Sequence, residues 1–152
     1  MKKHLAVVAA VVLQAAVAVW AVFPQLAAFA TGTEVRLAAA PVDPMDPFRG
    51  AYVQLDYPGL PEKADGSGDY HVPLVRDGDL WKGGTPTRTR PAAPYLNCEA
   101  FNEYLDCGLH SYFVSEDRAR RLEQNLSTGG LIAVLRVDGQ GRAVLTGLEE
   151  RP

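Results

Sequence analysis

Carboxylates that could bind a metal lie in and after one proline-rich stretch of this 152-residue chain. Asp43, Asp46 and Asp56 are candidates for a hard cation such as Ca²⁺, which takes six to eight oxygen ligands from closely spaced positions. Prolines separate these acids, without the usual glycine turn of a calcium loop. Because aspartates in turns commonly accept backbone N–H bonds, we predict a structural role for them and no metal site.

Histidines and serines show no spacing that indicates an active site. A zinc site needs three or four ligands, and His71 and His110, outside the N-terminus, belong to no recognisable His/Cys/carboxylate cluster. A serine/lysine hydrolase would need a depressed lysine pKa, but the sequence places neither Lys63 nor Lys82 on a buried strand. No G-x-S-x-G motif surrounds the serines outside the apolar start, Ser67, Ser111, Ser115 and Ser127. We predict no catalytic residue, cofactor or metal, with a signal-peptidase-like hydrolase as the alternative.

The N-terminal 30 residues have the pattern of a membrane anchor. Lys2 and Lys3 precede an uncharged run from Leu5 to Ala30, longer than the roughly 20 residues that a helix needs to span a bilayer. Lysines before the run predict an N-terminus in the cytoplasm and residues 31–152 on the outer side of the membrane. The small-x-small motif 28–30 leaves a cleaved signal peptide open, and a buried core helix is the third alternative.

The two cysteines, Cys98 and Cys107, are predicted to form a disulfide. An extracytoplasmic domain exposes both thiols to an oxidising compartment. If Asn102 and Glu103 are a two-residue hairpin loop, the cysteines face each other at a non-hydrogen-bonded pair with Cα atoms about 4.5 Å apart, which a disulfide accepts. Two reduced, buried cysteines or a metal pair are the alternatives.

Charge makes a nucleic-acid partner unexpected. The formal net charge of −3 falls to −5 once Lys2 and Lys3 are set aside. Arginines are close together at 88 and 90 and at 118–121, without forming the long cationic run that phosphate binding favours. Partners are therefore expected to be the lipid bilayer, through residues 5–30, and another membrane or envelope protein.

Alternation and turn residues predict one β-rich domain. The expected strands are Glu34–Ala39, Ala51–Tyr57, Tyr70–Val75, Leu80–Lys82, Leu131–Val137 and Arg142–Leu148. The last two are expected to form a hairpin with its turn at residues 138–141, and Tyr95–Val114 is dense in β-formers. Pro73 predicts that the strand Tyr70–Val75 is an edge strand or contains a bulge. The stretch Pro58–Asp69 is expected to be a mobile loop without a motif, and Ser115 is expected to start a short helix. The fold class is mainly β (β-rich α+β), with a single sandwich or curled sheet after a transmembrane helix.

The proline-rich corner and the strand after it resemble the signature of the bacterial GDYXXLXY protein family. The matching residues are Pro41, Asp43, Pro44, Asp46, Pro47, Arg49, Gly50, Tyr52, Leu55 and Tyr57, and the run from Cys107 to Glu116 is similar to the family's second block. The family has no assigned activity, so the resemblance implies an architecture from about Glu34 to the C-terminus. Ala51 stands where the family has Asp, so an activity that used this carboxylate would be lost here.

These observations together predict a non-enzymatic, membrane-tethered module that acts as an interaction or accessory subunit. Outward-facing aromatic residues of the β-rich region, Tyr52 and Tyr112, are candidates for the interface. A secreted ligand-binding domain, released by cleavage near Ala30, is an alternative besides the hydrolase.

Overall fold

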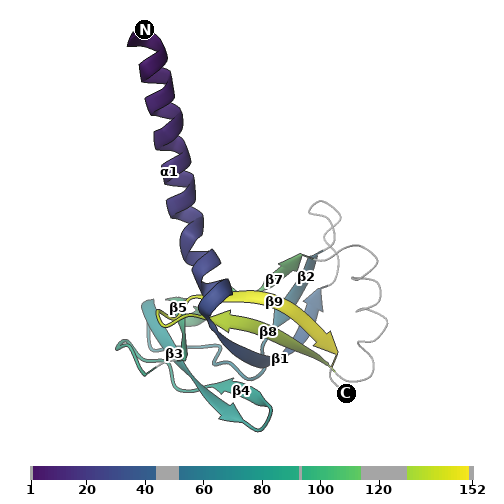
Figure 1. The fold of residues 1–152 in the computed structure, drawn as a ribbon. Coiled ribbons are helices and arrows are strands. Elements are labelled where there is room, and N and C mark those ends of the chain that lie inside the picture. The colour runs from purple at the N-terminus through teal and green to yellow at the C-terminus, as the bar shows by residue number, and fades with distance from the viewer. Residues whose placement is uncertain (1, 44–51, 93, 114–129, 151–152) are drawn as a thin grey trace.

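The computed structural model describes residues 2–43, 52–92, 94–113 and 130–150. Along the described chain, one helix leads into a curled, mixed sheet (Figure 1). The elements are α1 Lys2–Thr31, β1 Thr33–Asp43, β2 Tyr52–Asp56, β3 Gly68–Asp77, β4 Leu80–Gly83, β5 Tyr95–Phe101, β6 Tyr104–Asp106, β7 Ser111–Phe113, β8 Leu131–Val137 and β9 Ala143–Glu150.

The strands form a half-barrel in the order β6-β5-β3-β4-β1-β2-β7, and β8 and β9 extend the sheet from β1. All pairs are antiparallel except β1 with β4. The prediction of a β-rich α+β fold with a curled sheet is confirmed. The predicted short helix after Ser115 lies outside the described residues.

Strand β1 is the centre of the core. Val35, Leu37 and Ala39 alternate along it and are buried, as the period-2 pattern predicts. Its first seven residues pair with β8, and residues from Ala40 onward pair with β2. The strand therefore continues past Ala39, and Pro41, predicted as the start of the corner, pairs with Leu55. Pro41 fits there because the β8 pairing ends at Ala39, so its missing N–H interrupts no bond to β8.

Pro73 lies inside the sheet, so the prediction of an edge strand or a bulge is wrong. Strand β3 pairs with β5 up to Pro73 and with β4 from Leu74 onward. Pro73 therefore occupies the point where the strand changes partner. Its carbonyl still accepts a 2.7 Å hydrogen bond from the N–H of Gly84, just beyond β4.

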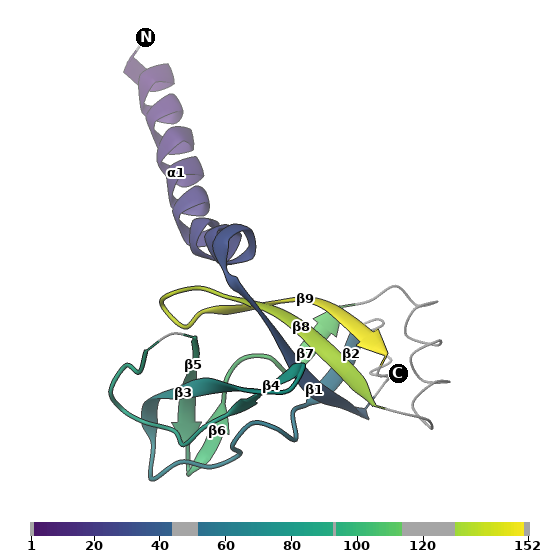
Figure 2. The ribbon, with the colours of Figure 1, turned by 60° about the horizontal axis from the view of Figure 1, so that its bottom comes forward.

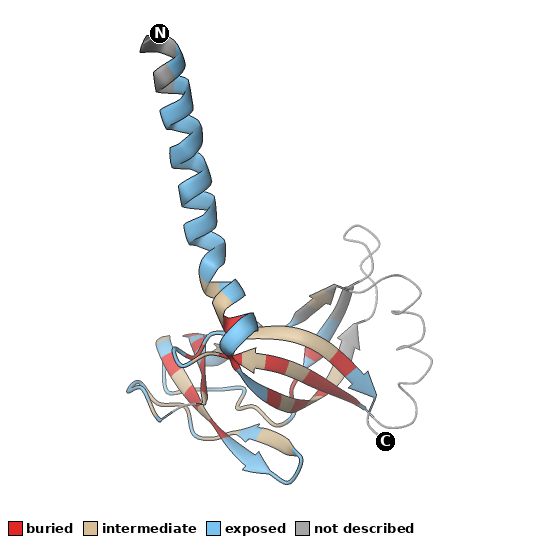
Figure 3. Ribbon diagram, viewed as in Figure 1, coloured by how far each residue is buried: buried red, intermediate tan, exposed pale blue. Residues whose placement is uncertain are grey.

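The last turn of α1 is built into the domain. Side chains from Val7 to Phe23 are all exposed, whereas Ala28 is fully buried, because this end of the helix contacts β8 and β9 (Figure 3). The N–H of Gly32 donates to the Ala28 carbonyl at 2.9 Å, and Arg136 Nη1 donates to the Gly32 carbonyl at 3.1 Å. A Cβ on Gly32 would lie 2.4 Å from that Ala28 oxygen. A single glycine thus joins helix and sheet at a close contact.

The predicted β8–β9 turn is confirmed, and Asp138 holds it together. Its Oδ1 accepts from the N–H groups of Gln140 and Arg142 at 2.8 and 2.9 Å, and its Oδ2 accepts from Arg142 Nε at 2.8 Å. Burial alone would raise the pKa of Asp138, but these hydrogen bonds together lower it. Ionised Asp138 therefore stabilises the folded state at pH values above its unfolded-state pKa. This stability is lost as the pH falls through the lower pKa of the folded state.

The same turn closes the half-barrel against β5. The Asn97 N–H donates to the Gly141 carbonyl at 2.8 Å, and Asn97 Nδ2 donates to the Gln140 carbonyl at 2.6 Å. Gly141 has a φ of +77° and is packed on the Tyr95 ring, where a Cβ would lie 2.4 Å from a ring carbon. Both the backbone conformation and the space therefore require glycine.

We predict that Gly141→Ala lowers the free energy of unfolding by about 2–4 kcal/mol, the sum of a left-handed backbone and an overpacked contact. Gly139→Ala is the matched control, because nothing lies within 4 Å of its added Cβ and its φ is not positive. Urea unfolding of both variants measures the difference. Equal stability of the two variants would contradict the closing contact.

Candidate pocket beside the signature strand

The end of the signature strand forms one wall of a pocket of about 350 Å³. Its walls come from the end of β2, the stretch 58–62, β6 and the segment 107–110 between β6 and β7. The apolar lining residues are Tyr57, Leu60, Pro61, Leu105, Cys107 and Leu109, and the polar ones are Asp56, Glu62, Tyr104 and His110. A concave apolar surface with a few polar groups at its margin is the usual form of a binding site.

Leu55 and Tyr57 explain the last part of the signature. Both are buried on the same face of the strand, and Gln54 and Asp56 are exposed, as alternation predicts. The Tyr57 hydroxyl donates to the Leu109 carbonyl at 2.8 Å, and burial raises the pKa of this phenol far above its usual value. Tyr57 thus stays neutral and ties the segment after β6 to the signature strand.

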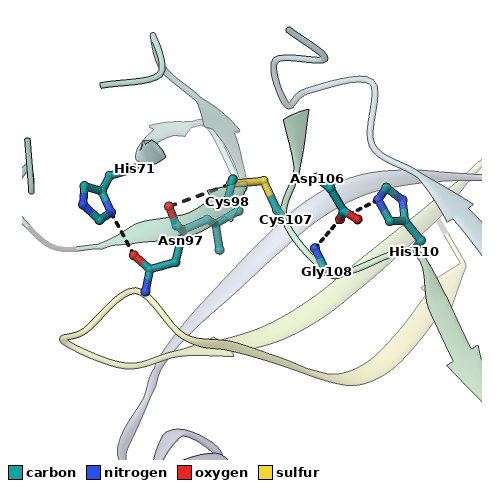
Figure 4. The surroundings of a disulfide bond; sticks show 8 residues. His71, Asn97, Cys98, Asp106, Cys107, Gly108 and His110 are labelled. Atoms are coloured by element: carbon teal, nitrogen blue, oxygen red, sulfur yellow. Dashed lines mark hydrogen bonds and ion pairs between the residues drawn. A yellow bond between two sulfur atoms is a disulfide. The ribbon is translucent and has the colours of Figure 1, made fainter. Parts of the chain in front are cut away.

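The cysteines are joined by a disulfide that holds the same segment (Figure 4). The predicted hairpin register is confirmed, since Phe101 pairs with Tyr104. Asn102 and Glu103 have φ values of 49° and 72°, the two positive angles of a type I′ turn. The Cα atoms of Cys98 and Cys107 are 4.0 Å apart, close to the spacing expected for a non-hydrogen-bonded pair.

Asp106 and His110 are the pair of polar residues at the pocket that most resembles part of a catalytic site. Asp106 Oδ1 accepts from the Gly108 N–H at 2.6 Å and lies 2.8 Å from His110 Nε2 (Figure 4). A carboxylate that orients an imidazole is one part of a nucleophilic site, which also needs a nucleophile in reach of the base. The hydroxyls among the lining residues are the phenols of Tyr57 and Tyr104, and the Tyr57 phenol already donates to Leu109.

A second, more polar pocket lies over β3 and β5, and both of its arginines are engaged, Arg90 through an Nη1 bond to Gln140 Oε1 at 3.1 Å. Arg88 Nη2 donates to the Asp65 and Ser67 carbonyls at 3.3 and 3.2 Å, and its guanidinium lies 4.6 Å from the Tyr70 ring centroid. His71 Nδ1 lies 2.8 Å from Asn97 Oδ1. This arrangement holds the loop before β3 in place.

Of the other residues considered in the sequence, the structure places only some. Pro44, Asp46, Pro47, Arg49, Gly50 and Ala51 lie outside the described residues, and Pro41, Asp43 and Tyr52 are described by their strand positions alone. Tyr112 is half-buried against the core, and its hydroxyl is 3.5 Å from the Thr146 carbonyl. Within the described ranges, no three His, Cys, Asp or Glu residues are placed to hold a metal ion.

Sequence reasoning missed the stretch 58–64, which was expected to be a mobile loop without a motif. Two backbone bonds attach this stretch to β6 and the turn before it, from the Ala64 N–H to the Glu103 carbonyl and from the Leu105 N–H to the Glu62 carbonyl. Leu60, Pro61 and Glu62 therefore become pocket walls. The only local signal was the pair Leu60-Pro61, an apolar couple within polar sequence.

The described residues define a class of β-rich α+β protein in which an apolar helix leads directly into a curled half-barrel sheet. The family model described as GDYXXLXY protein matches residues 14–148, so this chain belongs to the GDYXXLXY family. Neither a curated protein nor a solved structure gives a significant match.

We predict that the variant Cys98→Ser/Cys107→Ser loses about 2–3 kcal/mol of unfolding free energy, because the bridge closes a loop across a sequence separation of nine residues. Reduction of the unmutated protein should cause the same loss and leave the double variant unchanged. Urea unfolding with and without reductant gives both values. Free alkylatable thiols at both positions in protein from its native compartment would contradict the bridge.

Proposed function

We propose that this protein is a non-enzymatic, membrane-tethered, extracytoplasmic module that serves as an interaction or accessory subunit of another membrane or envelope protein. The observation that carries the proposal is the exposed apolar helix whose final turn is part of a disulfide-bridged β domain. Val7–Thr31 is long and apolar enough to cross a bilayer. Exposed apolar side chains along such a helix need lipid or another apolar partner.

The contacts of Ala28 favour a retained anchor over a cleaved signal peptide. Ala28 belongs to the small-x-small motif 28–30, but it lies within the helix, is fully buried and accepts the hydrogen bond from Gly32. In the folded domain, a protease would have to separate this turn from β8 and β9 before it could cut. Retention places the N-terminus inside, the domain in the periplasm or outside the cell, and a single span in the bacterial inner membrane.

The disulfide supports the same location, because such bridges persist in oxidising compartments. The hydrolase alternative rests on the Asp106–His110 pair alone, and no serine or threonine lines the described pocket. The secreted alternative requires loss of residues 1–30 and with them the buried Ala28. We therefore favour the tethered module over both.

We predict that carbonate extraction leaves the protein in the membrane pellet, with an intact mass that includes residues 1–30. Ala30→Leu, which removes the small residue at the end of the motif, should migrate like the unmutated chain. Recovery of a soluble protein that begins at Thr31, with the variant alone retained, would show cleavage and reject the anchor.

We predict that crosslinking in native membranes captures one partner protein in constant ratio to the tagged full chain. The control is the same residues 1–30 fused to an unrelated β domain, because it separates contacts of the domain from contacts of the helix. Capture of the same proteins by both chains, or of none by the full chain, would contradict an accessory-subunit role.

A further inference from the structure

We infer that the pocket beside the signature strand binds a lysine or arginine side chain and its apolar neighbour, presented by an extended segment of the partner protein. This inference rests on the proposed function, because it names the chemistry by which the module would recognise its partner. It depends on the shape of the pocket, the sign of its charge and its position relative to the helix.

The floor of the pocket suits an aliphatic side chain. Tyr57 and Leu109 are buried beneath it, and Leu60, Leu105 and Cys107 are only partly covered and pack on the core. A volume of about 350 Å³ is at the small end of the range for ligand pockets, so it fits one or two side chains. Long basic side chains bury their methylene stems on such surfaces and keep the charged head at the margin.

The margin of the pocket carries negative charge. Asp56 and Glu62 are exposed lining residues, and neither carboxylate has an ion-pair or hydrogen-bond partner among the described residues. Among the described residues, the lining contains no lysine or arginine, and its histidine is engaged by Asp106. Lys63 follows Glu62, but its ammonium lies over the Tyr104 ring at 5.5 Å and is not part of the lining. This charge repels phosphates and carboxylates and favours a cationic ligand.

The walls of the pocket are fixed in advance. The disulfide and the Tyr57–Leu109 bond hold one side. The Leu60 N–H bond to the Tyr57 carbonyl and the Leu105 N–H bond to the Glu62 carbonyl, both 2.8 Å, hold the other. Because these walls are already ordered, less conformational entropy is lost when a segment binds there.

The position of the pocket indicates a protein partner and not the bilayer. Figure 2 shows β6, one of its walls, at the end of the domain away from α1. With α1 in the membrane, this wall of the pocket lies on the far side of the domain from the lipid headgroups. A cationic, partly apolar segment of an envelope protein matches both this location and the charge.

Binding can be tested with the full chain in phosphatidylcholine nanodiscs and two peptides, acetyl-Gly-Leu-Lys-Leu-Gly-amide and its counterpart with Glu in place of Lys. Methyl NMR of leucine-labelled protein follows Leu60, Leu105 and Leu109, with the core residue Leu135 as the internal reference. We expect saturable shifts at the three pocket leucines with the lysine peptide only. Equal shifts with both peptides, or none, would overturn the inference.

Asp56→Asn combined with Glu62→Gln should weaken binding of the lysine peptide about tenfold, as expected for the loss of two exposed charge pairs. The matched control is Asp79→Asn with Glu99→Gln, two exposed carboxylates outside the pocket. Added salt should weaken binding to the unmutated chain and affect the pocket variant less. An unchanged affinity in the pocket variant, or the same loss in the control, would overturn the inference.

Butylammonium serves as the third probe, because it carries the cation without a peptide. Affinity equal to that of the lysine peptide would assign the pocket to a small amine and overturn the inference of a partner segment. If crosslinking captures a partner but the lysine peptide does not bind, the inference fails and the proposed function stands. If the peptide binds but no partner is captured, the proposed function fails.

Discussion

The structure depends on the backbone pairing of β1, a strand that three others share. Its first seven residues pair with β8, Leu37 also pairs with β4, and residues from Ala40 onward pair with β2. Buried N–H and C=O groups need hydrogen-bond partners, and the backbone of β1 finds them in these three neighbouring strands. With neighbours changing along its length, the twisted sheet curls around β1. The buried residues Val35, Leu37 and Ala39 then become the centre of the core.

The start of β1 also sets the direction of α1. Gly32 alone separates the helix from the strand, and its N–H and carbonyl are bonded to Ala28 and Arg136. A chain with one linking residue and two fixed hydrogen bonds has few free dihedral angles at that point. The helix is therefore attached to the domain as a rigid extension and not as a tether of adjustable length. In the proposed topology, this attachment determines which face of the domain is presented away from the membrane.

Two devices that both involve β5 stabilise the closed form of the sheet. At one, the Asp138–Arg142 turn packs on Tyr95 and bonds to Asn97, which closes the open side of the half-barrel. At the other, the disulfide and the Tyr57 hydroxyl hold the segment after β6 against the signature strand. The second device also forms the pocket, so the signature residues Leu55 and Tyr57 have a structural role that leaves the neighbouring Asp56 exposed at the pocket margin.

Local patterns in the sequence were enough to predict the apolar helix, the alternation along β1 and β2, the β8–β9 turn and the hairpin that pairs Cys98 with Cys107. Each of these depends on residues that are neighbours along the chain, where side-chain period and turn chemistry dictate the backbone. The tertiary structure alone decided the place of Pro73 inside the sheet, the pairing of the stretch 58–64 with β6 and the burial of Ala28. It also decided the pocket, because the lining residues come from two stretches, 56–62 and 104–110, that lie far apart in the sequence. Long-range pairing brings these segments together, and it leaves no periodic signal in any one of them.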